Sequence, residues 1–255
     1  MIALVRAEWT KLFTTRVWIG LLVGACLLVG GFTALFTGLA GSTDQNGQTA
    51  LPPVSDPQFQ QVALAQVAGA AVFVVILGII GMTQEYRHRT ATPTFLTTPR
   101  RGRVVAAKVL AYLLAAIPLA ILVTAVNLAV LEIYAGARGG APSLTGDNLR
   151  VIAGAASALV IYAVIGVGVG ALLRNQVGAI VGALVYLYVV EPVIAAIGPI
   201  ASAYKWLPGG ALRAMTTPFG GPDVLQPWQG ALLLLGYGLL AAVVGTLLTV
   251  RRDIT

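Results

Sequence analysis

The sequence predicts an all-α polytopic membrane protein with six transmembrane helices, an N-terminal interfacial helix and cytoplasmic N- and C-termini. Two observations support this fold class. Hydrophobic residues make up 58% of the 255 residues and charged residues only 10%, whereas a soluble domain usually carries about 25% charged residues. The few charges are also clustered between long apolar stretches, so they cannot form the polar surface that a soluble fold of this size requires.

Six stretches are long and apolar enough to cross a bilayer, which takes roughly 20 residues of α-helix. They lie near residues 17–40, 62–82, 109–131, 151–173, 177–197 and 230–250. Among the 16 basic and 9 acidic residues, only Glu191 falls inside one of these stretches. We therefore treat residues 1–255 as a single transmembrane domain. The first stretch is too long for the apolar region of a signal peptide, so we expect it to be a retained anchor.

The basic residues predict the orientation. With the N-terminus inside, twelve Lys and Arg residues lie in inner segments and four in outer segments. Cytoplasmic loops carry an excess of Lys and Arg, so both termini are expected in the cytoplasm. The net charge of +7 is thus explained by topology, and no nucleic acid partner is expected because no recognition motif accompanies the basic residues.

Three segments outside the spans have a distinctive composition. In residues 1–16, apolar residues that include Trp9 and Phe13 recur at helical spacing beside basic ones, which favours a helix lying at the headgroup boundary over a plain juxtamembrane extension. The outer loop 41–61 contains three prolines, among them Pro57, and these are expected to exclude a regular helix. Residues 198–227 are too broken to span and too apolar for solvent, which indicates an outer re-entrant segment.

The usual catalytic motifs are absent from the sequence. The three lysines are followed by Leu12, Val109 and Trp206, so none completes the phosphate-binding Gly-x4-Gly-Lys-Ser/Thr motif. His-Glu-x-x-His and Gly-x-Ser-x-Gly are also missing. With a single His and a single Cys, no metal site of the usual ligand spacing is expected. We therefore expect neither catalytic residues nor a cofactor bound by this chain.

Two acids near the outer side could be functional or structural. Glu132 ends the third span, where the interface can solvate it. Glu191 lies inside the fifth span, where an acid costs a few kcal/mol by insertion scales and usually faces protein or water. Two interpretations of these polar sites stay open. One is a structural pair of Glu191 with Arg150, Lys205 or Arg213, and the other is a polar lining near the exit of a substrate path.

Small residues occur at the spacing that lets two helices approach closely. Gly20 and Gly24 are four residues apart in the first span, as are Gly178 and Gly182 in the fifth. Such pairs support close helix packing, either within one chain or between two copies in a dimer.

The inner loop 83–108 carries the most informative pattern. A short segment between Pro93 and Pro99 is flanked by basic clusters, and Phe95 and Leu96 are its only large apolar residues. An exposed aromatic anchor favours docking to a cytoplasmic partner. A loop that merely obeys the positive-inside rule, or one that binds anionic lipid, is the alternative.

This loop resembles the one between the second and third spans of type-2 permeases of ABC exporters. That family has an acid at the span exit, then Thr, Pro, basic residues and a Lys entering the next span. The matching positions here are Glu85, Thr90, Pro99, Arg100, Arg101 and Lys108. The N-terminal residues Arg6, Glu8, Lys11 and Arg16 resemble the family's elbow helix. The six-span plan and the outer segment before the last span also agree, so the resemblance covers the whole chain.

The resemblance implies the permease subunit of an ATP-driven exporter in the plasma membrane of a bacterium. It would pair with a second permease subunit, identical or related, and with two separate ATPase subunits that bind ATP and Mg. The residues implied in coupling are Glu85, Thr90, Pro93, Phe95, Leu96, Pro99, Arg100, Arg101 and Lys108. Two other functions remain open: a membrane scaffold or assembly factor without a transport path, and a secondary transporter, for which Glu191 would be the intramembrane coupling group.

Overall fold

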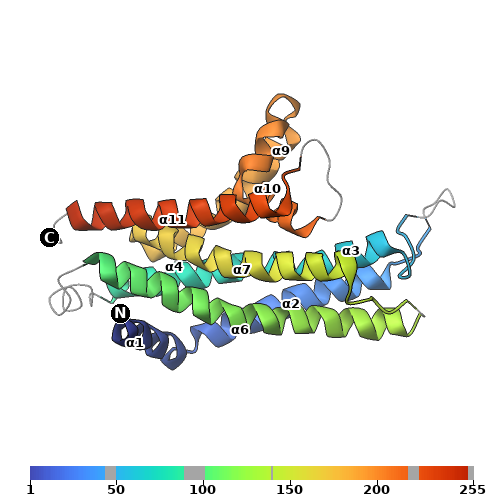
Figure 1. Cartoon of the computed structure of the whole chain (residues 1–255), viewed down its shortest axis with the longest axis horizontal. Helices are drawn as coiled ribbons and strands as arrows, with labels where there is room; N and C mark the ends of the chain where they lie inside the picture. Colours follow the sequence, from blue (N-terminus) through green and yellow to red (C-terminus); the bar gives the residue numbers. More distant parts are fainter. Residues whose placement is uncertain (44–49, 89–100, 139, 218–223, 252–255) are drawn as a thin grey trace.

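The computed structural model describes residues 1–43, 50–88, 101–138, 140–217 and 224–251. These residues form helices and no strand, and the long helices lie side by side in an elongated bundle (Figure 1). In chain order the elements are α1 (Ile2–Thr14), α2 (Val17–Gly38), α3 (Pro57–Ala65), the 3-10 turn η1 (Gln66–Ala70), α4 (Ala71–Arg87), α6 (Arg101–Gly136), α7 (Gly146–Leu173), α8 (Gln176–Val185), the π-helical η2 (Tyr186–Val190), α9 (Glu191–Ala196), the 3-10 helix η3 (Gly198–Trp206), α10 (Pro208–Thr216) and α11 (Pro227–Arg251).

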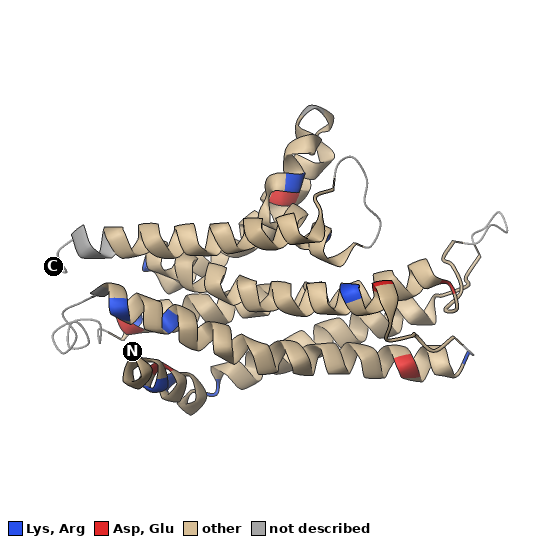
Figure 2. Cartoon of the chain, in the orientation of Figure 1, with Lys and Arg blue, Asp and Glu red and all other residues tan. Residues whose placement is uncertain are grey.

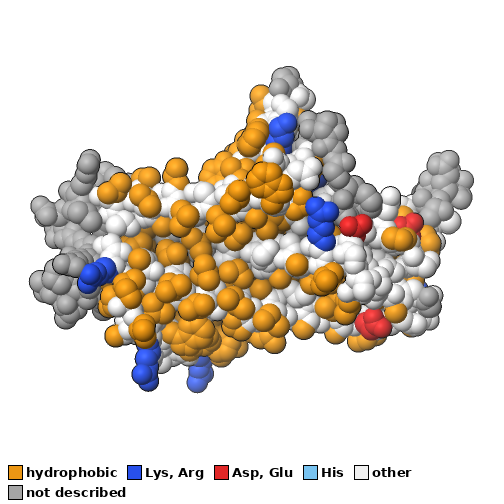
Figure 3. All heavy atoms as spheres, viewed as in Figure 1, with side chains coloured by type: hydrophobic (Ala, Val, Ile, Leu, Met, Phe, Trp, Pro, Cys, Tyr) orange, Lys and Arg blue, Asp and Glu red, His pale blue; other side chains and the backbone are white. Residues whose placement is uncertain are grey.

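Six helical segments among the described residues are long and apolar enough to cross a membrane. They are Val17–Gly38, Pro57–Arg87, Gly102–Gly136, Gly146–Leu173, Gln176–Ala196 and Pro227–Leu247. This confirms the all-α class and the six predicted stretches. Hydrophobic side chains cover most of the visible face of the bundle, and charged ones lie toward its ends and edges (Figure 3). Both features fit a multi-pass membrane protein, since lipid solvates such a surface.

The second and third helical segments extend well beyond the apolar stretches that predicted them. The second runs over 57–87 rather than 62–82, and the third over 102–136 rather than 109–131. A hydropathy pattern finds the apolar centre of a helix, while the polar residues at its ends continue the same backbone hydrogen bonding. Consequently much of the predicted inner loop 83–108 is helical.

The expectation that prolines exclude a helix from residues 41–61 is wrong at Pro57. This residue occupies the first turn of α3, where a missing N–H removes no helical hydrogen bond. Asp56 precedes it as the N-cap, and its Oδ1 accepts from the N–H groups of Gln58 at 2.7 Å and Phe59 at 3.3 Å. The sequence Asp-Pro therefore starts this helix instead of preventing it.

Helix α7 lies at the centre of the bundle and packs against α4, α6 and α11. Glycines make the contact between α4 and α7 unusually close. A Cβ atom on Gly78 would meet the Ala163 carbonyl oxygen, and one on Gly166 would meet the Val75 backbone. The two backbones therefore touch with no side chain between them, which is how small residues bring membrane helices together.

Short helices also form in the N-terminal segment and in the segment that precedes the last span. Helix α1 covers Ile2–Thr14, and it lies at the same end of the bundle as the end of α11 (Figure 1). Residues 198–227 contain η3 and α10, and α9 projects away from the long helices (Figure 1). The placement of α1 at a membrane surface, the re-entry of residues 198–227 and the cytoplasmic location of the termini stay predictions.

Candidate functional site

Four charged side chains from distant parts of the sequence meet at the end of the bundle where α1 lies and α11 ends. Glu8 and Lys11 belong to α1, Glu85 to the end of α4 and Lys108 to the beginning of α6. We call these four residues the ion cluster. Charged residues are visible at that end of the bundle, while the middle of the long helices is free of them (Figure 2).

Each lysine of the ion cluster bridges both carboxylates. Lys108 Nζ donates to Glu8 Oε2 at 2.6 Å and to Glu85 Oε1 at 3.1 Å, and it donates also to the Gly81 carbonyl at 3.2 Å. Lys11 Nζ donates to Glu8 Oε1 and to Glu85 Oε1, both at 2.7 Å. All three donors of Lys108 are therefore used, and two ammonium groups balance two carboxylates.

The cluster is buried on one side and open on the other. The side chain of Lys108 is 1% exposed, that of Glu8 5% and that of Glu85 7%, whereas Lys11 is 41% exposed. Buried charges are tolerated only when they are paired and hydrogen-bonded, as they are here. Partial burial lowers the pKa of Lys11, but hydrogen bonds and charges from Glu8 and Glu85 outweigh it, so that this pKa is raised above 10.5. Lys11 therefore remains protonated at neutral pH.

Local sequence explains how the cluster is assembled. Glu8 and Lys11 are three residues apart on one face of α1, a spacing at which helical side chains meet. Leu12 follows on the same side and is buried in the main hydrophobic core, which docks α1 onto the bundle. On α4, a Cβ atom on Gly81 would collide with the ring of Tyr112. A glycine at this position thus leaves room for the ring and exposes its own carbonyl to Lys108.

The structure joins residues that the sequence assigned to two different features. Glu8 and Lys11 were expected in the elbow helix, and Glu85 and Lys108 at the two ends of the coupling loop. Arg6 and Arg16, by contrast, are exposed and take no part in the ion cluster. Gly81 and Tyr112 were not predicted, because a glycine and a tyrosine in apolar spans carry no distinguishing sequence signal.

The other predicted coupling residues are not placed. Thr90, Pro93, Phe95, Leu96, Pro99 and Arg100 lie outside the described residues. Arg101 is the first residue of α6, and its side chain lies outside the described part of the structure. Helix α4 ends at Arg87 and helix α6 begins at Arg101. These two residues mark where the loop leaves the bundle and where it returns to it.

Glu191 is buried, at 3% exposure, but its partners are not the cations considered from sequence. Its Oε1 accepts from the Gly209 N–H at 3.1 Å, and the Tyr186 side chain lies near its carboxylate. Among the described residues, no ion pair joins Glu191 to Arg150, Lys205 or Arg213. Gly209 is in the first turn of α10, so the acid is stabilised by a helix N-terminus. Glu132 is exposed near the end of α6.

Of the four glycines in the two pairs, one packs closely against another helix of the same chain. Gly24 packs within the chain, because a Cβ atom there would lie 2.7 Å from the ring of Phe73. Gly20 and Gly182 have no neighbouring atom within 4 Å of such a Cβ, and Gly178 would contact only its neighbour Asn175. Contact of these three positions with a second copy stays a prediction.

Comparison of the chain with protein-family models found no match, and comparison with curated proteins found none either. The function must therefore be inferred from the residues and their geometry.

Proposed function

We propose that the chain is the membrane-spanning permease subunit of an ATP-driven ABC exporter. It would work in the plasma membrane of a bacterium with a second permease subunit, identical or related, and with two copies of a separate ATPase subunit that holds ATP and Mg. The loop that joins α4 to α6 would face the cytoplasm and receive the movement of the ATPase. The observation that carries the proposal is the ion cluster.

The ion cluster is suited to transmit such a movement. Glu85 lies two residues before the end of α4, and Lys108 lies seven residues after the start of α6. The cluster therefore clamps the two helices that carry the loop, and it ties both to α1 through Glu8 and Lys11. A force on the loop would move three helices together, because breaking a buried ion pair costs about 3–5 kcal/mol.

The alternatives account less well for the same cluster. A secondary transporter uses ionisable groups near the membrane midplane that take up and release an ion. The ion cluster lies at one end of the bundle, and its charges are mutually paired. A passive scaffold would need helix packing but not a buried clamp at both ends of a basic loop. The secondary transporter and the scaffold therefore remain second choices.

The proposal is tested by isolating the chain with its partners under mild detergent conditions. We expect an ATPase with a Walker A motif to copurify at about one copy per permease chain, and the purified permease alone to hydrolyse no ATP, since no phosphate-binding motif is present in its sequence. A Lys108→Met variant should lose coupling between substrate and hydrolysis. Hydrolysis by the isolated chain, or a stable homogeneous preparation that carries no ATPase, would contradict the proposal.

A further inference from the structure

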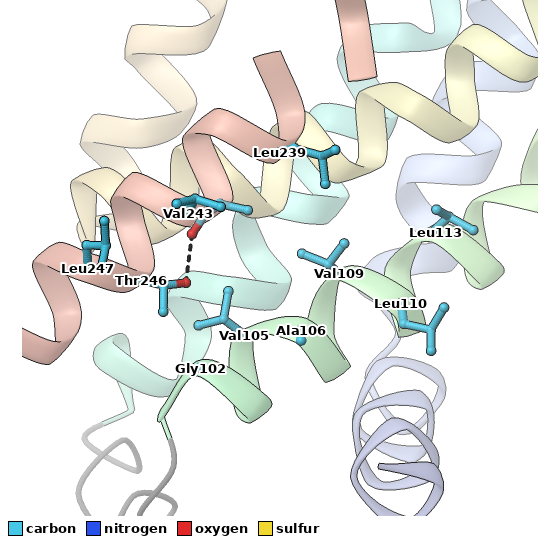
Figure 4. Close-up of a pocket in the computed structure, with 11 residues that line it drawn as sticks. Gly102, Val105, Ala106, Val109, Leu110, Leu113, Leu239, Val243, Thr246 and Leu247 are labelled. Atoms are coloured by element: carbon cyan, nitrogen blue, oxygen red, sulfur yellow. Dashed lines mark hydrogen bonds between the residues drawn. The ribbon is translucent and has the colours of Figure 1, made fainter. Parts of the chain in front are cut away.

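A groove of about 410 Å³ lies between α6 and α11, at the end of the bundle that carries the ion cluster (Figure 4). A strip of α6 from Gly102 to Leu113 forms one wall, and a strip of α11 from Leu239 to Leu247 forms the other. Among the described residues of the lining only Thr246 is polar, and its hydroxyl donates to the Ala242 carbonyl at 2.7 Å. The walls therefore fit an apolar chain and offer no free donor to a polar ligand.

The groove is closed near the start of α6 and widens toward the middle of the bundle. A Cβ atom on Gly102 would lie 3.7 Å from the Thr246 methyl group, so the two helices meet there. From that point α6 and α11 diverge (Figure 1). The strip of α6 from Gly102 to Leu113 is about 16 Å long at about 1.5 Å per residue. One leaflet of the hydrocarbon core is about 15 Å thick, so the groove has the length of one leaflet.

Both helices bring an arginine to the closed end of the groove. Arg103 lies two turns before the groove residue Leu110, on the same side of α6. Its side chain is exposed, and within the described part of the chain it has no ion-pair partner. Arg251 occupies the last position of α11, one turn beyond the groove residue Leu247. Positive charge therefore flanks the place where the groove reaches the end of the bundle.

The charge at this end is not neutralised by the acids that the structure describes there. Those two carboxylates belong to the ion cluster and are bound to its lysines. In the sequence, Arg252 and Asp253 follow α11 and offset each other. The first turn of α6 contains no acid, and the start of a helix attracts anions because its first N–H groups point outward. An anionic group beside Gly102 and Arg103 is therefore favoured by both the helix and the arginines.

We propose that this groove binds an anionic phospholipid, such as phosphatidylglycerol, from the leaflet that faces the ion cluster. One acyl chain lies between the apolar faces of α6 and α11, and the headgroup phosphate lies beside Arg103 at the start of α6. The groove favours a lipid over a helix of a second copy, because a helix is about 10 Å across and does not fit the end where Gly102 meets Thr246. The inference does not depend on the proposed export function.

Photoreactive phospholipids test the proposal directly. The chain, with any partner that copurifies, is placed in phosphatidylcholine nanodiscs that contain a small fraction of a lipid with a diazirine in one acyl chain. Two such probes share the same chains and carry either the phosphatidylglycerol or the phosphatidylcholine headgroup. After irradiation, labelled residues are mapped by mass spectrometry. We expect Leu110 and Val243 to be labelled at least about fivefold more by the anionic probe, the effect of one basic residue on anionic lipid, and the exposed surface around Ala125 to be labelled equally by both.

Two pairs of variants test the headgroup and the chain separately. Arg103→Gln should lower the preference for the anionic probe in the groove about fivefold, while Arg16→Gln, at an exposed arginine between α1 and α2, should leave it unchanged. Ala106 lines the groove, and Ala125 is exposed on the same helix outside the lining. Ala106→Phe should therefore abolish groove labelling by both probes, and Ala125→Phe should not. Equal melting temperatures of the two Phe variants would exclude misfolding as the cause.

Three results would overturn the inference. Equal groove labelling by the two probes would show that the groove does not select an anionic headgroup. An unchanged preference in Arg103→Gln would show that the headgroup does not lie beside this arginine. Absence of groove labelling in the original chain, with labelling around Ala125 intact, would show that protein, such as a second copy, covers the groove. The assay measures no ATP hydrolysis, so this proposal and the proposed export function fail separately.

Discussion

Replacing Lys108 by Met should be among the most damaging single changes outside the hydrophobic core. The substitution keeps most of the apolar volume of the side chain but removes the ammonium that donates to Glu8, Glu85 and the Gly81 carbonyl. The cluster then carries a net charge of −1 in a place where Glu8 is 5% exposed. Leaving a buried charge without its partner costs about 3–5 kcal/mol.

The ion cluster contains its own control. Lys11 makes two bonds of the same kind at 2.7 Å, but its side chain is 41% exposed. Water can replace much of what it supplies, so Lys11→Met should cost about 1 kcal/mol, as an exposed ion pair does. Glu8→Gln combined with Lys108→Met restores neutrality. This double variant should be more stable than the sum of the two single losses predicts.

The assay is the free energy of unfolding in mixed micelles, titrated with SDS, for the four variants Lys108→Met, Lys11→Met, Glu8→Gln and the double variant. A loss of about 3 kcal/mol or more is a large share of the 5–15 kcal/mol that stabilises a typical protein. Equal losses for the two lysine variants, or strict additivity in the double variant, would refute the argument that burial of paired charge determines the stability of the cluster.

Three further predictions concern topology, packing and the loop. In a background without the native cysteine, a cysteine at Ser143 should react with an impermeant reagent from outside and one at Thr97 should not, because basic residues mark the inner side; the reverse pattern would invert the orientation. Gly81→Ala should lower the unfolding free energy by at least about 1–3 kcal/mol, since it overpacks against a tyrosine ring, and an unchanged melting temperature would show that the ring can move. Changing Phe95 and Leu96 together to Ala should weaken ATPase binding by about 2 kcal/mol if they form an aromatic anchor, whereas unaltered binding with intact insertion would favour contact with the inner leaflet.

The helices were predictable because their signal is local. Twenty consecutive apolar residues have few alternatives to spanning a bilayer, so composition and charge distribution identified all six segments. Their ends were predicted less well. Pro57 was expected to break a helix. A proline that follows a capping aspartate instead occupies the first turn of a helix, as it does in α3. That distinction depends on where the helix starts, which hydropathy alone does not give.

The candidate sites depended on contacts that no local pattern encodes. Glu8 and Lys108 are 100 residues apart, so only the docking of α1 onto α4 and α6 brings them together. The four members of the ion cluster were selected by resemblance, but their mutual pairing was not predicted. From the sequence, Glu191 was paired only with cations, whereas in the structure its carboxylate accepts from the backbone N–H of Gly209. Uncharged N–H donors at a helix N-terminus also stabilise a carboxylate. Because they carry no charged side chain, the positions of Lys and Arg in the sequence do not reveal them.

The ion cluster is connected to the centre of the bundle by two helices, α4 and α7, whose backbones touch. Glu85 lies near the end of α4, and the same helix carries Gly78, which touches the backbone of α7. On α7, Gly166 makes the reciprocal contact with the Val75 backbone of α4. Closely packed backbones transmit a displacement because no flexible side chain separates them to absorb it. A shift of the α4 end at the cluster must therefore move α7 or open the glycine contact.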